Sequence, residues 1–217
     1  METQFSLNME LPLSFYRQTD VVSIARDLLG KSLFTDFNGV ITGGIITETE
    51  AYAGVTDKAS HAFGNRFTER TQIMYLEGGC AYVYLCYGIH SLFNIVTNQE
   101  GIPHAVLIRG IHPTVGLEVM LERRGLKHAG KDFCKGPGKV SKALGIHYSH
   151  TGILLSKTAA VDDEMKIWVE DNQRIVHDDQ IIISPRIGVD YAGEDALLPY
   201  RFELKNNFKL PVGNKYQ

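Results

Sequence analysis

Hydrophobic and polar residues alternate over several short stretches of this chain, a period-two pattern that is typical of β-strands. SLFTDF (32–37) and VITGGIITETEAY (40–52) flank Asn38-Gly39, a pair that favours a two-residue hairpin turn. CAYVYLCYGIHSLFNIVTN (80–98) is a second expected hairpin, with Gly88 at its turn. The other expected strands lie within 104–111, 165–171, 180–189 and 198–205.

Three segments have the spacing of short helices instead. Thr19-Asp20 is an expected N-cap for VVSIARDLLG (21–30), and the other two helices are expected at 114–125 and 138–145. Strands dominate and their connections are short, so the sequence predicts a mixed α/β (α+β) fold around a curved, largely antiparallel β-sheet, with short flanking helices and a protruding β-hairpin. No repeat or linker divides the chain, and residues 1–217 are expected to form a single domain.

The composition, with 44% hydrophobic and 22% charged residues among 217, is that of an ordinary globular protein. The three cysteines form no C-x-x-C pair, so we expect buried free thiols in a reducing compartment. The sequence has no basic start followed by an apolar run, and its longest apolar stretches are too short to cross a bilayer. We therefore expect a cytoplasmic protein that has no membrane partner.

Charge is distributed unevenly along the chain. Residues 105–144 contain eight Lys or Arg and three acidic residues, whereas residues 160–195 contain three Lys or Arg and ten acidic residues. This asymmetry fits a basic face that meets phosphates while acidic surface is turned away. Chance clustering on a solvated surface would give the same pattern, so both interpretations stay open.

IITETEAY (45–52) contains the strongest candidate for catalysis. A strand period of two places Ile46, Glu48, Glu50 and Tyr52 on one face, with the Cα atoms of the two glutamates about 6.5–7 Å apart. Two such carboxylates can divide the roles of acid and base. An edge strand that presents acidic residues to solvent would have the same spacing. Glu50 is the better candidate for a base that activates water, because it lies near the end of the strand beside Tyr52.

Candidate binding groups lie in two loops. His61 could read a hydrogen-bonding edge as a neutral imidazole, or could simply be exposed. GPGK (136–139) lacks the glycine spacing of a nucleotide-triphosphate loop, but its backbone could lie against a DNA phosphate backbone. The lysines that would contribute there are Lys135, Lys139 and Lys142. No H-E-x-x-H, paired cysteine or deaminase motif occurs, so no metal and no cofactor are expected.

Tyr87 precedes the expected turn at Gly88 and should therefore lie at the tip of a hairpin. The alternation places Tyr82, Tyr84 and Cys86 on one face of its strand. An aromatic side chain at a protruding tip can wedge between base pairs. A tyrosine that simply packs in the core is the plainer expectation for the earlier positions in the strand.

These motifs occur together in one known family. TETEAY, His61, GCAYVYLCYG, Asn94, VLIRGI, GPGK, RIGVDYAGE and LPYRF follow one another in this order. Each motif is weak alone, but the ordered set is specific and extends from about the first helix to Phe202. The chain thus resembles the alkyladenine (methylpurine, or 3-methyladenine) DNA glycosylases, which excise damaged purines in base excision repair. The absence of a long N-terminal extension is typical of a bacterial-type member.

The resemblance implies a role for each matching residue. Glu50 would activate the attacking water, which Arg109 and the main-chain carbonyl of Ile187 would help to hold. Tyr87 would enter the duplex at the place that the extruded nucleotide leaves. The base-binding pocket would consist of Tyr52, His61, Tyr84 and Asn94.

The implied activity is that of a monofunctional hydrolase. It would flip damaged purines out of double-stranded DNA and leave an abasic site, the expected lesions being N-methylated purines, hypoxanthine and etheno adducts. No lysine lies beside Glu50 in the sequence, so no Schiff base and no strand cleavage are expected. The resemblance further implies a monomer associated with the nucleoid. Two other classes remain: a non-catalytic nucleic-acid-binding module of the same fold, and a sugar O-glycosidase that uses Glu48 and Glu50 as its carboxylate pair.

Overall fold

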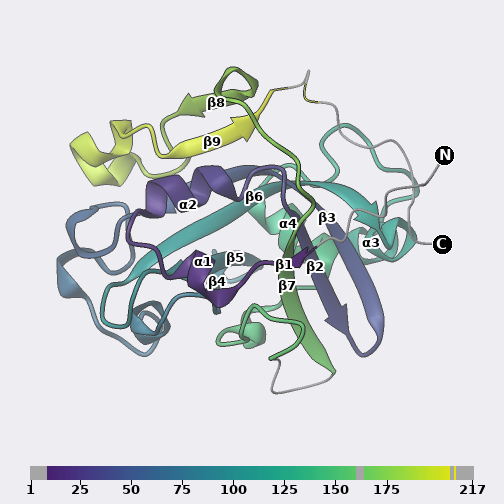
Figure 1. The fold of residues 1–217 in the computed structure, drawn as a ribbon, viewed down its shortest axis with the longest axis horizontal. Helices are drawn as coiled ribbons and strands as arrows, with labels where there is room; N and C mark the ends of the chain where they lie inside the picture. Colours follow the sequence, from purple (N-terminus) through teal and green to yellow (C-terminus); the bar gives the residue numbers. More distant parts are fainter. Residues whose placement is uncertain (1–8, 160–163, 206–207, 209–217) are drawn as a thin grey trace.

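A single β-sheet organises the computed structural model, which describes residues 9–159, 164–205 and 208 (Figure 1). Among these residues the sheet has nine strands in the order β1-β7-β2-β3-β6-β5-β4, with β9 paired to β3 and β8 paired to β9. All of these strand pairings are antiparallel. The strands are β1 Met9–Glu10, β2 Ser32–Phe37, β3 Val40–Tyr52, β4 Ala81–Cys86, β5 His90–Thr97, β6 His104–Val115, β7 Met165–Asp171, β8 Ile181–Ser184 and β9 Arg201–Leu204.

The helices are short and lie between these strands in sequence. The α-helices are α1 Leu13–Tyr16, α2 Val21–Asp27, α3 Leu117–Arg124 and α4 Pro137–Leu144. The 3-10 helices are η1 Gly54–Thr56, η2 Phe63–Asn65, η3 Gln72–Tyr75, η4 Tyr148–His150, η5 Asp178–Gln180 and η6 Asp190–Leu197. The predicted α+β fold around a largely antiparallel sheet is confirmed. That all of residues 1–217 form one domain stays a prediction, because part of the chain lies outside the described residues.

One helix prediction is wrong at its start. The helix expected at 114–125 begins only at Leu117, because Thr114 and Val115 continue strand β6. Gly116 separates the two elements with a φ of 69°, a left-handed conformation that glycine adopts without a steric penalty. The apolar residues on both sides of this glycine belong to different elements, so their combined pattern resembled one longer helix.

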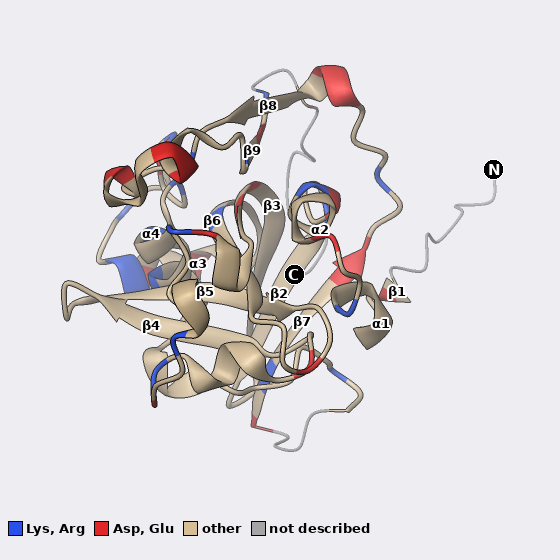
Figure 2. Ribbon diagram, turned by 90° about the vertical axis from the view of Figure 1, so that its left-hand side faces the viewer, with Lys and Arg blue, Asp and Glu red and all other residues tan. Residues whose placement is uncertain are grey.

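The two predicted hairpins have similar turns but different turn residues. Asn38 and Gly39 both have positive φ angles (56° and 79°), as a primed turn requires. Tyr87 and Gly88 do as well (52° and 72°), although a tyrosine adopts this conformation much less readily. Figure 2 shows the β4–β5 hairpin projecting from the body of the protein. Tyr87 is therefore at an exposed tip, as predicted, and 92% of its surface is accessible.

The sheet uses its two faces differently. Val106 and Ile108 of β6 belong to the main hydrophobic core, whereas Ala105, Leu107 and Arg109 line a cavity on the opposite face. Strands β4 and β5 follow the same alternation. Ala81, Val83, Phe93 and Ile95 lie in the core, and Tyr82, Tyr84, Cys86, Leu92 and Asn94 line the cavity. The alternation therefore places one set of side chains in the hydrophobic core and the other set in the wall of the cavity.

Helices α2 and α4 close the core face. The Asp20 side chain caps α2 by accepting hydrogen bonds from the amides of Val22 and Ser23, as predicted for this N-cap. Ile24 and Ala25 of α2 pack into the same core as Val140, Ala143 and Leu144 of α4. The Thr49 hydroxyl of β3 donates to the Ala25 carbonyl at 2.7 Å, which ties α2 to the strand that carries the glutamates.

The cysteines are free, as expected, but their burial differs. Cys80 and Cys134 are buried, whereas Cys86 is only half-buried near the hairpin tip, where it lines the cavity. The prediction of burial is therefore wrong for Cys86. Within the described part of the chain, no helix has the length and apolar character that crossing a membrane requires.

Candidate active site

A cavity of about 300 Å³ opens on the sheet face opposite the main core, beside the hairpin tip. Strands β3 to β6 supply its floor, and the loops after β3 and β8 supply its rim. The residues that line it include the four expected pocket positions, Tyr52, His61, Tyr84 and Asn94. They also include Arg109 and Ile187, expected to hold the water, and Tyr87, expected to enter the duplex. Glu50 is fully buried and reaches this site through its contacts with Tyr52, Arg109 and Ile187.

The strand register around the glutamates is irregular. Ile46 pairs with Ile111, Glu48 with Gly110 and Thr49 with Ile108, so Thr47 is an extra residue in β3 and Arg109 is an extra residue in β6. The face prediction for Ile46 is wrong for this reason. The bulge interrupts the alternation, and Ile46 lies in the main core while Glu48 and Glu50 both contact Arg109.

Glu50 is held from three sides. The Ile187 amide donates to its Oε1 at 2.8 Å, the Tyr52 hydroxyl donates to its Oε2 at 2.8 Å, and Arg109 Nε lies 3.3 Å from Oε1. Burial raises the pKa of Glu50 above its ordinary value, and these three partners oppose that rise by favouring the anion. The result is a carboxyl group that is a stronger base than an exposed glutamate and has a fixed orientation.

Glu48 occupies a different environment from Glu50. Its Oε1 accepts hydrogen bonds from Arg109 Nε at 3.0 Å and from Arg201 Nε at 2.6 Å. Arg201 also pairs with Glu203 at 2.7 Å. Glu48 is nearly inaccessible to solvent and lines a different cavity, whereas Glu50 is bonded to Tyr52 and Ile187, which line the 300 Å³ cavity. Both glutamates are buried, so the alternative of an exposed edge strand is excluded.

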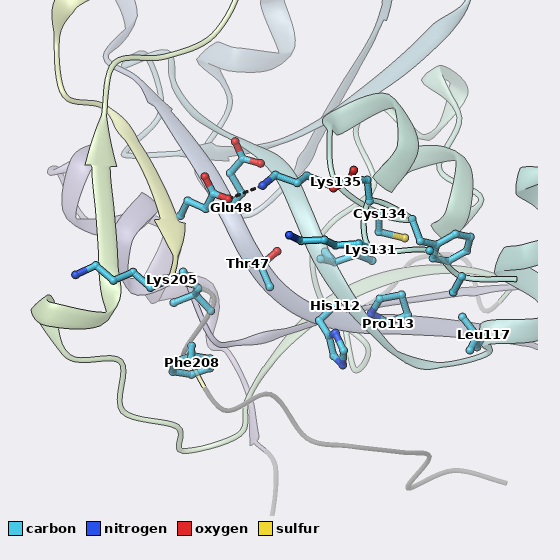
Figure 3. A pocket seen from close by; sticks show the side chains of 17 residues that line it. Thr47, Glu48, His112, Pro113, Leu117, Lys131, Cys134, Lys135, Lys205 and Phe208 are labelled. Carbon is cyan, nitrogen blue, oxygen red and sulfur yellow. Dashed lines mark hydrogen bonds and ion pairs between the residues drawn. The ribbon is translucent and has the colours of Figure 1, made fainter.

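A second cavity, of about 430 Å³, lies on the other side of this charged network (Figure 3). Glu48, Lys131 and Lys135 are among the residues that line it. Lys135 bonds Glu203 at 2.9 Å there, and this hydrogen bond raises its pKa above the ordinary value. Lys135 therefore lies apart from Lys139 and Lys142, although all three were expected at one phosphate-binding surface.

Tyr52 forms one aromatic wall of the site and is supported by a buried ion pair. The guanidinium of Arg186 lies over the Tyr52 ring, 4.8 Å from its centroid. Arg186 bonds Asp57 with two nitrogens, one of them at 2.8 Å, and both side chains are almost completely buried. Arg186 also donates to the carbonyl of Ala51 at 2.9 Å. These bonds fix the segment before Ile187 against the end of β3.

His61 and Tyr84 form the facing wall. Their rings meet edge to face with centroids 4.6 Å apart, and His61 Nδ1 lies 2.7 Å from the hydroxyl of Tyr82. Burial, together with the nearby cations of Arg70 and Arg66, lowers the pKa of His61 to about 4. His61 is therefore a neutral imidazole at neutral pH, the form that the sequence analysis assumed. The alternative of a freely exposed loop histidine is excluded.

Asn94 lies at the base of the cavity on β5 and is buried. Its side-chain nitrogen donates to the carbonyls of Tyr82 at 3.1 Å and Leu92 at 3.2 Å. Both bonds hold the side-chain amide of Asn94 in one orientation at the cavity.

A third cavity, of about 510 Å³, adjoins the hairpin tip and is basic. Its lining includes Tyr87, His90, Arg124, Lys139 and Lys142. Helix α4 begins beside it at Pro137, directly after the GPGK glycine Gly136. Figure 2 shows the Lys and Arg residues near α3 and α4, and acidic residues on η5 and η6 near β8. The charge asymmetry of the sequence thus becomes a spatial asymmetry around the site.

Several residues of the site were not predicted from the sequence. Asp57 and Arg70 lie in loops without a periodic pattern. Arg186 belongs to the motif RIGVDYAGE and was expected in a strand over 180–189, but β8 ends at Ser184 and Arg186 follows it in a loop. Tyr191 of η6 lines the cavity as well, and its hydroxyl donates to the Ala59 carbonyl at 3.1 Å. In the described ranges, no cluster of three or more His, Cys, Asp or Glu could hold a metal ion.

Known proteins share this sequence over almost its whole length. Residues 14–208 match the model of the methylpurine-DNA glycosylase family. A Chlamydia felis protein is 45% identical over 195 residues, which are 89% of this chain and 95% of that protein. Proteins of Clostridium perfringens and Bacillus cytotoxicus are each 40% identical, over 206 and 205 residues, which are 92% of this chain and 97% and 98% of those proteins.

The provisional name of all three relatives is 3-methyladenine DNA glycosylase. Because the family match covers far more than half of the chain, the resemblance found in the sequence is confirmed. The chain belongs to the methylpurine-DNA glycosylase family and is a DNA glycosylase, a hydrolase that acts on N-glycosidic bonds.

Proposed function

We propose that this protein is a monofunctional DNA glycosylase that extrudes damaged purines from double-stranded DNA and hydrolyses their N-glycosidic bond, leaving an abasic site. The observation that carries this proposal is the arrangement of Glu50. Its carboxylate is buried, has a raised pKa and is bonded to residues that line a cavity of about 300 Å³. Tyr87, an exposed tyrosine at a hairpin tip, lines the same cavity.

Tyr87 is the proposed intercalating residue. A base inside a duplex is out of reach of any pocket, so the nucleotide must first leave the stack. Tyr87 is 92% exposed on a tip whose backbone is fixed by a bond from the Ile89 amide to the Cys86 carbonyl at 3.2 Å. Because Tyr87 also lines the mouth of the cavity, a wedge at this point would fill the space beside an extruded nucleotide.

The extruded purine would lie between the two aromatic walls. Tyr52 would stack on one side and His61 with Tyr84 on the other, since all three line the cavity. His61, as a neutral imidazole, would also hydrogen-bond to the base. Asn94, fixed at the base of the cavity, would disfavour the exocyclic amine of guanine. Methylated purines, hypoxanthine and etheno adducts all fit a site of this kind.

Glu50 is the proposed general base. It would take a proton from a water molecule that attacks the anomeric carbon of the sugar, and Arg109 and the carbonyl of Ile187 would help to hold that water. As the bond breaks, positive charge develops on the sugar, and the Glu50 carboxylate would stabilise it. No lysine is present among the described residues that line this cavity, which supports hydrolysis without a Schiff base.

DNA would lie across the hairpin tip and the basic cavity beside it. Lys139 and Lys142 are the proposed contacts with the phosphate backbone, because they line this cavity together with Tyr87. Lys135 is a weaker candidate, since it bonds Glu203 in a different cavity. One protein chain is enough to bind one extruded nucleotide, so we expect the protein to act as a monomer. Its site of action would be the nucleoid.

The two alternative classes are less well supported. A sugar O-glycosidase would need Glu48 and Glu50 to face one substrate, but Glu48 lines the cavity of about 430 Å³, whereas Glu50 is bonded to residues that line the other cavity. A non-catalytic binding module would have no use for a buried carboxyl group with a raised pKa that is bonded to three residues lining a pocket.

The test measures release of free base from a duplex that contains one N-methylated purine or one hypoxanthine. Glu50→Gln should lower the release rate by about 10²-fold or more, the contribution of a positioned base, while duplex binding persists. Glu100→Gln makes the same change at an exposed site and serves as the matched control. Equal binding with no release by the native protein would support the binding module instead. A covalent enzyme–DNA adduct trapped by borohydride would contradict the monofunctional mechanism.

A further inference from the structure

Both aromatic walls of the proposed base pocket have an arginine on their outer side. Arg186 lies 4.8 Å from the ring centroid of Tyr52, and Arg70 lies 4.7 Å from that of Tyr84. Neither arginine is among the residues that line the 300 Å³ cavity. Each guanidinium therefore lies against the ring of a pocket tyrosine without lining the cavity itself.

The two arginines differ in whether a carboxylate compensates their positive charge. Arg186 is neutralised by Asp57 in a buried ion pair. Arg70 is exposed, and its contacts are with the neutral rings of His61, Tyr82 and Tyr84. In the part of the chain that the structure describes, no ion pair joins Arg70 to a carboxylate. Arg70 thus places an uncompensated positive charge directly behind one wall of the pocket.

We infer that Arg70 is a specificity-determining residue that biases the pocket toward neutral damaged purines and against cationic ones; this inference rests on the function proposed above. The face of an aromatic ring attracts cations through its quadrupole. A guanidinium against the ring of Tyr84 opposes that attraction by direct repulsion of a second cation. A neutral purine such as hypoxanthine meets no such repulsion, whereas 7-methylguanine carries a full positive charge.

Arg70 also fixes the state of His61. A guanidinium only donates hydrogen bonds, and one nitrogen of Arg70 lies 3.0 Å from Nε2 and 3.3 Å from Nδ1 of His61. An imidazole must be neutral to accept a hydrogen bond at a ring nitrogen, so this contact favours the neutral ring. The cation of Arg70 disfavours a second proton on this ring, in agreement with the lowered pKa of His61. The same side chain therefore places a charge beside Tyr84 and favours the neutral state of His61.

The experiment compares single-turnover release of 7-methylguanine and of hypoxanthine at saturating enzyme, which reports extrusion and bond cleavage rather than DNA affinity. Arg70→Gln should raise the ratio of the 7-methylguanine rate to the hypoxanthine rate by about fivefold, the effect of one exposed cation–π interaction. Arg70→Lys retains the charge and should keep the native ratio. Arg66→Gln removes a second exposed arginine of the same loop and is the matched control, which should also keep it.

A second readout separates this role from a merely structural one. In Arg70→Gln the pKa of His61, followed by its ring NMR signals, should rise from about 4, because one of the cations that lower it is gone. An unchanged rate ratio in a folded Arg70→Gln protein overturns the inference, and uniformly weaker DNA binding would then mark Arg70 as a phosphate contact. If the native protein releases neither base, the proposed function fails first and the inference falls with it.

Discussion

Arg109 lies beside Glu50 at a point where β6 has one more residue than β3 between two paired positions. Glu48 pairs with Gly110 and Thr49 with Ile108, which leaves Arg109 without a partner in the ladder. Its Nε lies 3.0 Å from Glu48 and 3.3 Å from Glu50. A bulge of this kind re-aims a side chain, and here it directs one cation at two buried carboxylates.

The proposed base makes the pH dependence of base release predictable. Glu50 must be ionised to accept a proton, so the rate should fall as the pH drops through its pKa, which burial raises above the ordinary value. Arg109 holds that pKa down. Arg109→Gln should therefore move the acidic limb of the rate profile to higher pH and lower the plateau rate. A limb that stays in place would show that another group is titrating.

Glu48 should act on the same pKa in the opposite direction. Its negative charge raises the pKa of Glu50, so Glu48→Gln should move the acidic limb to lower pH. The variant also leaves the buried Arg109 and the half-buried Arg201 with one carboxylate fewer, and we expect a loss of about 3 kcal/mol in the free energy of unfolding. Rate profiles and denaturant unfolding of Glu48→Gln and Arg109→Gln together check both signs. Shifts in the same direction would contradict this account.

Tyr87 should reduce stability while it serves function. Its φ of 52° strains any residue with a side chain, by about 1 kcal/mol, and glycine would relieve this strain. Tyr87→Gly should therefore unfold at a higher denaturant concentration yet release base more slowly, because the wedge is lost. Asn38→Gly, with a φ of 56° in the other hairpin, is the control and should leave the release rate unchanged. Full activity in Tyr87→Gly would remove Tyr87 from the proposed mechanism.

The sequence predicted the parts of this molecule that follow local rules. Asn38-Gly39 implies its turn, and the alternation in β4 correctly placed Tyr82, Tyr84 and Cys86 on one face. The ordered motifs identified the family. Ile46 was placed on the wrong face because a bulge depends on the pairing of two strands, and neither strand alone reveals it.

Long-range partners were outside the reach of local patterns as well. Asp57 and Arg186 are separated by 129 residues and meet only in the folded chain. Arg70 gave no signal, because a single charge in a polar loop looks like any solvated residue. Residue types and their periodicity predict which side chains face the core, whereas the folded positions of the loops decide which charged side chains meet.

The Asp57–Arg186 pair should be a strong determinant of stability. Because both side chains are almost fully buried, removing one partner leaves an unpaired charge, and Asp57→Asn or Arg186→Met should each cost about 3–5 kcal/mol. The double variant should cost less than the sum of the two, by about 1–3 kcal/mol. The exposed pair Arg17–Glu77 is the control, and Glu77→Gln should cost less than about 1 kcal/mol. Additive losses in the double variant would show that the pair is not coupled.

The basic cavity beside Tyr87 predicts a salt dependence. Each lysine that contacts a phosphate releases condensed counterions, so the slope of log affinity against log salt concentration reports the number of contacts, at about 0.9 per phosphate. Lys139→Gln and Lys142→Gln should each make this slope shallower by about that amount and weaken binding to damaged and undamaged duplex alike. Lys135 is occupied by Glu203 in a different cavity, and Lys135→Gln should leave the slope nearly unchanged. A shallower slope for Lys135→Gln alone would move the DNA path to the Glu203 side of the protein.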